Sequence, residues 1–458
     1  MSVRSVLAVA LASAAFVLAV TTVSRDVVLI AAGGVAAGAF AIMVAARPRE
    51  SVTLLCVAGA LLLDFSPLRV YRYFLLSDLL LLLAFLIQWR IDRSRLIYVP
   101  ALWIGLCVAY LGAMLVSFAA ARDFSGLWTW AHSAFLMLVF VPSLTTLFVR
   151  RPELKGWLLA AIVATALVQS VILFGEIASG LEWRSGTRIS GALGTTGLWN
   201  YAAAATALAG LVAVGRWPTR LAALGGLTVI AVAEMFLRSR MLWLTSIFGA
   251  CLMLSLYERR LLRGVAVAVV AAAAISVGYL ANWYPDAIQR RIEDALHPTQ
   301  ASDLIARLQV IRELTGAIEE SGGIGIGAAQ SERYLREHHS TAPVVTIHNI
   351  VLHAAVEGGL IAASAMLLLP LSIAALWRAA AREPVRGWPA FLVSWETSVL
   401  LAVYAGSQLT PSLYEHTFYA IVAALAASAV HVEARAGGRP LHDALGAIAG
   451  RQIASAVK

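Results

Sequence analysis

The chain has 458 residues, of which 60% are hydrophobic and only 13% are charged. Because about 25% of the residues of soluble globular domains are charged, this composition excludes a soluble globule and indicates a protein that folds in a lipid bilayer. The net charge of +9 does not indicate nucleic-acid binding, since the basic residues are spread over many short loops.

Apolar runs of about 20 residues allow a helix to cross a hydrocarbon core of roughly 30 Å. The sequence has about fourteen such runs and predicts an all-α polytopic membrane protein with about 12–14 transmembrane helices. The runs lie at 5–23, 27–46, 50–64, 74–89, 98–119, 127–148, 156–177, 197–214, 219–236, 241–257, 262–280, 349–377, 389–406 and 414–431. The first run resembles a signal peptide, but the many runs after it favour a retained anchor.

The three cysteines, Cys56, Cys107 and Cys251, lie inside apolar runs. This placement predicts packing residues and no disulfide framework.

Basic residues alternate between the two sides of the predicted membrane. With a cytoplasmic N-terminus, the inside loops carry most of the arginines, which is the positive-inside pattern. The inside set is Arg47, Arg49, Arg90, Arg93, Arg95, Arg150, Arg151, Lys155, Arg216, Arg220, Arg259, Arg260, Arg263, Arg378, Arg382 and Arg386. We therefore expect a multi-pass inner-membrane protein whose functional face is non-cytoplasmic.

The predicted organisation has five parts. They are N-terminal transmembrane helices (1–176), central transmembrane helices with outward arginine loops (177–280), a periplasmic helical loop (281–347), C-terminal transmembrane helices (348–432) and a basic cytoplasmic tail (433–458). The loop alone is long enough to hold structure outside the membrane, and it predicts two short helices followed by an irregular end.

The second loop helix should begin near Ser302, a suitable N-cap, and end at Gly322-Gly323. An apolar stripe at helical spacing consists of Leu304, Ile305, Leu308, Ile311, Leu314 and Ile318. At 100° per residue, Arg307 falls on this apolar face. It is expected to approach the membrane or the helix bundle; the alternative is that its guanidinium snorkels to water.

Gly323-Ile324-Gly325-Ile326-Gly327 superficially resembles a nucleotide-binding glycine run. No strand and helix surround it as that motif requires. We therefore expect a close-packed turn at the membrane edge.

His348 is expected to begin the run at 349–377, in the first turn of a helix. There the positive end of the helix dipole disfavours imidazolium and keeps the ring neutral near pH 7. A neutral imidazole can accept a proton, so His348 is a candidate general base; the alternative is an interfacial polar residue or helix cap. His297, His338, His339 and His353 are weaker candidates.

Two outward arginines are candidate anion ligands. Arg240 begins an apolar run after the tight turn containing Ser239, where a charge is costly without a partner. Arg188 lies in a glycine-rich loop, which is otherwise a place for a solvated arginine. Arginine suits phosphate oxygens, and several converging on one site would bind a diphosphate. The spacing of carboxylates and histidines suggests no metal site, and no cofactor is expected.

Four segments in this order resemble the bacterial O-antigen ligase and O-antigen polymerase superfamily of membrane glycosyltransferases, over roughly residues 160–410. They are Arg188-Ile-Ser-Gly191 followed by Asn200; Ser239-Arg240; Arg307 before the glycine run; and His348-Asn349 followed by Glu357-Gly358-Gly359. The ligase signature ends in Gly, Thr or Tyr three residues after Gly359, where this chain has Ala362.

The resemblance implies a GT-C-like bundle that transfers a glycan, without metal and with inversion, from an undecaprenyl-diphosphate-linked donor. It implies His348 as the base, with Arg240, Arg307 and Arg188 holding the diphosphate. Asn349, Ser239, Glu357 and Gly359 would be supporting residues. A ligase would use lipid A core as the acceptor, and a polymerase another carrier-linked glycan. A transporter or lipid flippase is a further alternative, since intramembrane arginines also line anion paths.

Overall fold

The computed structural model describes residues 53, 56, 57, 69–71, 74–91, 101–124, 126–178, 198–237, 240–258, 302–338, 349–380, 388–407, 423–425, 427 and 428. Six helices in these ranges are long and apolar enough to cross a membrane, and two shorter ones are apolar. The prediction of an all-α multi-pass membrane protein is confirmed. A small hairpin of β1 (Arg69–Tyr71) and β2 (Phe74–Leu75) departs from it.

Several predicted elements lie wholly or mostly outside these residues. They are the runs at 5–23, 27–46, 50–64, 262–280 and 414–431, the first loop helix and the basic tail. Where the predicted runs can be compared, helix ends differ from them by at most three residues; for example, the run at 98–119 forms α5 (Ala101–Ala121).

One of two compact units comprises Met1–Ser94 and Gly156–Ser239. It contains α4 (Leu76–Ile91), most of α8 (Glu153–Ala178), α9 (Leu198–Val214) and α10 (Trp217–Leu237). Helices α9 and α10 pack along each other. Alanines 202–205 and 207 of α9 are all buried, and small side chains of this kind let helices approach closely in a membrane.

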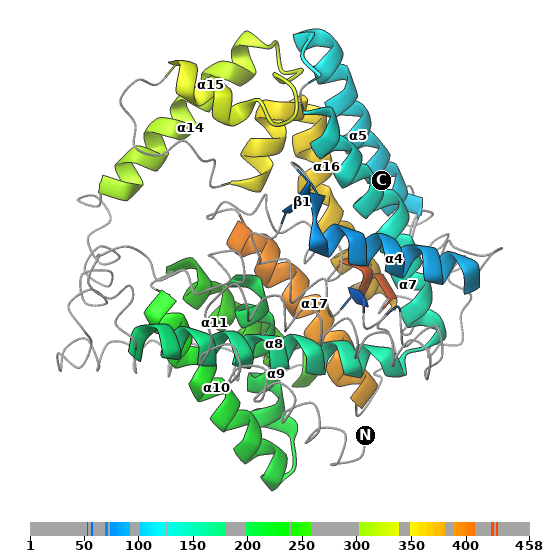
Figure 1. Ribbon diagram of the computed structural model, residues 1–458, viewed down its shortest axis with the longest axis vertical. Coiled ribbons are helices and arrows are strands. Elements are labelled where there is room, and N and C mark those ends of the chain that lie inside the picture. The colour runs from blue at the N-terminus through cyan, green and yellow to red at the C-terminus, as the bar shows by residue number, and fades with distance from the viewer. Residues whose placement is uncertain are drawn as a thin grey trace, which may run out of the picture. The chain divides into compact units, whose positions relative to one another are not determined.

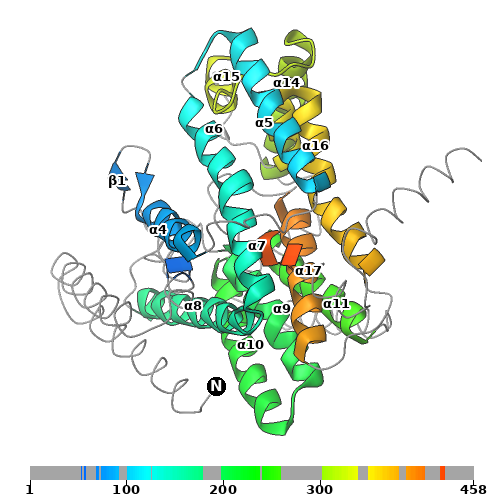
Figure 2. The same ribbon diagram turned by 90° about the vertical axis from the view of Figure 1, so that its right-hand side faces the viewer.

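The second unit comprises Arg95–Lys155 and Arg240–Lys458. Its long helices form two closely packed pairs, one of α5 with α16 (Ile350–Ala380), and one of α11 (Arg240–Glu258) with α17 (Trp388–Ser407). Figures 1 and 2 show α5 and α16 side by side, with α14 (Ser302–Glu320) and α15 (Ser331–His338) at one end of this pair.

A π-helical turn interrupts the span at 127–150. Helix α6 (Leu127–Ala134) continues through η1 (Phe135–Phe140) into α7 (Val141–Arg150). The sequence predicts one helix here, and the structure keeps one span but places a wide turn in its middle. Such turns are rare and concentrate at functional sites.

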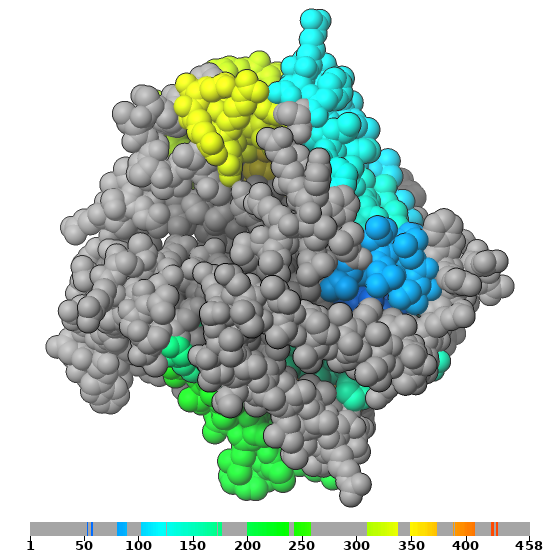
Figure 3. Space-filling model, viewed as in Figure 1, coloured from blue at the N-terminus to red at the C-terminus, as the bar shows by residue number. Residues whose placement is uncertain are grey.

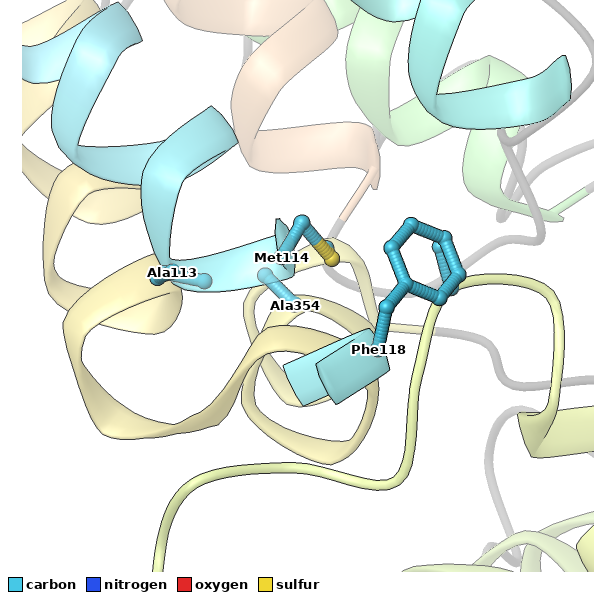
Figure 4. Packing of buried hydrophobic residues seen from close by; sticks show 6 residues of the cluster. Ala113, Met114, Phe118 and Ala354 are labelled. Atoms are coloured by element: carbon cyan, nitrogen blue, oxygen red, sulfur yellow. The ribbon is translucent and has the colours of Figure 1, made fainter. Parts of the chain in front are cut away.

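Alanine and methionine side chains join α5 to α16. Ala113, Met114 and Phe118 of α5 form one buried cluster with Ala354 and Ala362 of α16 (Figure 4). Met114 lies beside Gly358, whose Cβ, if present, would be 2.8 Å from the methionine sulfur. The C-terminal part of α5 therefore packs directly on the first turns of α16.

Within the second unit, a buried ion pair joins Lys155, in the first turn of α8, to Glu396 of α17. Lys155 Nζ lies 3.1 Å from Glu396 Oε2, and both side chains are almost completely buried. The assignment of Lys155 to a charged loop is wrong, because α8 begins at Glu153 and includes it. An intramembrane charge needs a partner of this kind.

Removing one partner of this pair should destabilise the fold much more than removing both. We expect Lys155→Ala to lower the free energy of unfolding by about 3–5 kcal/mol, because it leaves a buried carboxylate unpaired. The double variant Lys155→Met, Glu396→Leu should unfold near the wild-type temperature. Thermal unfolding in detergent measures both, and a double variant as unstable as the single one would contradict this account.

Candidate active site

Helix α16 begins at Ile350, and Asn349 caps it. The backbone N–H of Leu352 donates to Asn349 Oδ1 at 2.7 Å, which is the hydrogen bond of an N-cap to the third helical residue. The helix therefore begins one residue after the start of the predicted run at 349–377. His348 lies outside the described residues, and its place stays a prediction.

A break at Gly359 divides α16 within its first three turns. Gly359 has φ 76° and ψ −172°, a backbone conformation available essentially to glycine alone. The N–H of Leu360, which a regular helix would direct to Val356, donates to the carbonyl of Gly323 at 3.0 Å. The carbonyl of Val356 accepts from Ile326 N–H at 2.8 Å instead. The break thus exchanges helical hydrogen bonds for bonds to the segment after α14.

The carbonyl of Glu357 is used in the same way. It accepts from Gly327 N–H at 3.0 Å and from the hydroxyl of Ser117, on α5, at 2.6 Å. Three separate parts of the second unit, namely α5, α16 and the glycine run, therefore meet at one peptide of α16.

The glycine run 323–327 is a close-packed turn, as predicted. A Cβ on Gly325 would lie 2.6 Å from the backbone nitrogen of Gly359, and a Cβ on Gly359 would overlap the carbonyl oxygen of Gly323. Glycine at these positions lets two backbones touch. Helix α14 ends just before this turn, where Gly323 N–H bonds Ile318 O, so its predicted end is also confirmed.

The irregular end predicted for the loop contains a further helix, α15. Its inner side joins a core formed by Val310, Leu314, Ala317, Leu335 and Val356. The predicted stripe of α14 needs correction, because Ile311 is 43% exposed while Val310 is buried. The buried face of α14 is therefore centred near Leu314. This face packs on α15 and α16. Figure 3 shows the other side of these helices exposed.

Glu357 lies beneath the start of α15 and belongs to a buried cluster with Ser331 and His353, which we call the Ser331–His353–Glu357 cluster. Ser331 Oγ donates to Glu357 Oε1 at 2.6 Å, and His353 Nε2 lies 3.0 Å from the same oxygen. Ser331 Oγ is 3.1 Å from His353 Nε2. The Ser331 N–H also points to Oε1, at 3.4 Å. A carboxylate in this place satisfies free N–H groups at the start of a helix.

Ser331 has one hydroxyl proton, which it donates to Glu357 Oε1 at 2.6 Å. That proton is therefore not directed at His353 Nε2. A serine-nucleophile triad, in which histidine removes the serine proton, does not fit this arrangement.

The other predicted site residues are described only in part. Arg240 is the first residue of α11, as expected from the run at 241–257, and Arg307 lies within α14. Arg188 and Ser239 lie outside the described residues. The structure thus assigns contacts to Asn349, Glu357 and Gly359 and leaves the convergence of His348 and the arginines as a prediction.

The sequence does not predict Ser331 as a site residue, because it lies in the segment expected to be irregular. It predicts His353 only as a weaker candidate, because that residue lies deep in the span. The signal that was present is spacing, since Asn349, His353 and Glu357 follow one another at intervals of four residues, on one helix face.

In the first unit, Asn200 of α9 is completely buried. Neither its amide nitrogen nor its amide oxygen has a hydrogen-bond partner in the structure described. An unpaired buried amide costs about 1–3 kcal/mol and requires an explanation such as a binding role.

Residues 225–367 match the family model described as O-antigen ligase. The matched segment contains Ser239, Arg240, Arg307, His348, Asn349, Glu357 and Gly359, whereas Arg188 and Asn200 precede it. The resemblance stated from the four segments is confirmed over this range. No curated protein matches the chain.

Proposed function

Because residues 225–367 match the O-antigen ligase family model and the described residues contain six helices able to cross a membrane, we propose that this chain is a ligase-type glycosyltransferase. It would transfer a glycan from undecaprenyl diphosphate to lipid A core on the periplasmic face of the bacterial inner membrane. The family match carries this proposal, because the predicted base and two of the three predicted diphosphate ligands lie within it.

In the proposed reaction, His348 accepts the proton of an acceptor hydroxyl. The acceptor oxygen forms a bond to the anomeric carbon of the donor as the bond from that carbon to the diphosphate breaks, with inversion. Arg240, Arg307 and Arg188 stabilise the charge that develops on the leaving diphosphate, and electrostatic stabilisation of this kind is commonly the largest contribution to catalysis.

Local structure supports these roles without showing them. Asn349 fixes the start of α16 directly after His348, and Arg240 begins α11, where the helix N-terminus adds positive potential. Arg307 precedes Val310 and Leu314 of the buried face by three and seven residues, which is the spacing of one helix face.

The acceptor decides between ligase and polymerase. Purified protein given a carrier-linked donor and lipid A core is expected to produce glycan-modified lipid A. Longer carrier-linked glycans with unmodified lipid A would contradict the ligase assignment and support the polymerase. Transport of the donor across vesicles without any new glycosidic bond would support the transporter.

Ala362 keeps the polymerase as the second candidate, because it departs from the ligase signature. It is completely buried and belongs to the cluster that α16 forms with Ala113, Met114 and Phe118 of α5. The packing of α16 on α5 therefore accounts for a small residue here, so the departure has a structural reason whichever acceptor is used.

Arg240→Ala is expected to raise the KM for the donor about 10–100-fold, because a charge-assisted hydrogen bond contributes about 1.5–3 kcal/mol. Steady-state kinetics with varied donor measure this. Arg216→Ala is the matched control, since Arg216 is exposed in the turn between α9 and α10 and is expected on the opposite side of the membrane. An equal effect of both variants would argue against a diphosphate site at Arg240.

A further inference from the structure

The first two turns of α16 need contacts beyond their own helix to fix their direction. The break at Gly359 separates residues 350–358 from the rest of α16, and backbone bonds of Val356, Glu357 and Leu360 run to other segments. Because of this break, the direction of the transmembrane part of α16 does not by itself fix the direction of residues 350–358.

The Ser331–His353–Glu357 cluster supplies such contacts on the side of α15. Its three residues are at most 6% exposed, so the hydrogen bonds act in a medium of low dielectric constant, where hydrogen bonds are strong and specify one arrangement. Exposed contacts surround it, including an ion pair of Arg333 with Asp123 at 3.3 Å and a hydrogen bond of Tyr334 to Glu320 at 3.1 Å. Burial and then this hydrogen bond raise the pKa of the Tyr334 phenol.

The cluster lies close to the predicted base along the chain. His353 N–H donates to the carbonyl of Asn349 at 2.9 Å, so His353 is one helical turn after the cap, and His348 is the residue just before the cap. Any tilt of these turns relative to α15 would displace His348.

We propose that Ser331, His353 and Glu357 are positioning residues for the transfer reaction, and that they act by fixing the first turns of α16 against the start of α15 and so setting the place of His348. This inference rests on the proposed function. The cluster is assigned a positioning role and no role in proton transfer to substrate, because its members are buried and Ser331 Oγ, His353 Nε2 and Glu357 Oε1 contact one another.

Kinetics of Ser331→Ala, His353→Leu and the double variant test this proposal. We expect each variant to lower kcat about 10–100-fold, since displacing a reacting group by about 1 Å costs roughly this much. The KM for the donor should change less than about three-fold. Because one hydroxyl bridges the other two side chains, the double variant should be no slower than the slower single variant.

Two further variants separate positioning from general stability. Ser372→Ala is the matched control, because Ser372 is a buried serine of α16 whose hydroxyl donates only to the carbonyl of Leu369; it should keep the wild-type kcat. Ser331→Thr retains the hydroxyl and should recover most of the kcat lost in Ser331→Ala. A threonine variant as slow as the alanine variant would overturn the proposal.

Other outcomes also decide the question. Lower yield and melting temperature with an unchanged kcat per folded molecule would show that the cluster only stabilises the fold. Multiplicative losses in the double variant would show independent roles. His348→Ala, measured in parallel, distinguishes the two proposals: an active His348→Ala enzyme contradicts the proposed function, whereas an inactive one beside a fully active Ser331→Ala enzyme contradicts the positioning role alone.

Discussion

His348→Ala is expected to lower the kcat of glycan transfer by about 10²–10⁴-fold, which is the usual contribution of a general base. The variant should bind the donor as the wild type does, because the diphosphate is assigned to arginines. Single-turnover assays with carrier-linked donor measure the chemical step, and binding of labelled donor measures affinity.

Two other outward histidines are suitable controls for this variant. His338 ends α15, and His297 lies in the same predicted loop, without a helix beginning directly after it. His338→Ala and His297→Ala are expected to retain activity within a few-fold of the wild type. If either of them were as inactive as His348→Ala, the loop as a whole and not His348 would be the sensitive element.

Gly359→Ala is expected to lower the free energy of unfolding by roughly 4–5 kcal/mol and to prevent normal folding of α14 and α15. Its φ of 76° with ψ −172° costs a residue with a side chain about 1–3 kcal/mol. The new methyl group would in addition overlap backbone atoms of Gly323 and Ile324, which cannot move aside as a flexible side chain can.

Hydrogen exchange and thermal unfolding of the purified protein test this prediction. Gly359→Ala should lose protection in α14 and α15 as well as around position 359. Gly112→Ala is the control, because nothing lies within 4 Å of a Cβ on this glycine of α5; the substitution should be neutral or slightly stabilising. Wild-type stability in Gly359→Ala would show that the break in α16 does not require glycine.

The transmembrane helices could be predicted from the sequence because the bilayer imposes a long, uniform apolar signal. Helices α5 and α17 show this, since both begin and end within a few residues of the predicted runs. The exact start of a helix and the contacts of single residues could not be predicted from this apolar signal. The start of α16 depends on a hydrogen bond from Leu352 N–H to Asn349 Oδ1, and this start lies one residue after that of the predicted run at 349–377.

The cluster and the break are long-range features, and for that reason they were invisible in the sequence. Glu357 was selected only through a resemblance, and its partner Ser331 lies 26 residues away in the chain. The need for glycine at position 359 likewise depends on Gly323 and Gly325, whose backbones approach it from another segment. Lys155 resembles a loop charge until Glu396, 241 residues later, is known to lie beside it.

That separation has a consequence for biogenesis. Lys155 leaves the ribosome long before Glu396, so α8 must enter the bilayer with an uncompensated charge in its first turn. The long aliphatic stem allows the ammonium group to stay at the interface during this time. Only when α17 arrives can the charge enter the protein interior. Nascent chains that stop before α17 should therefore be poor in stable tertiary structure around α8, and a good target for membrane quality control.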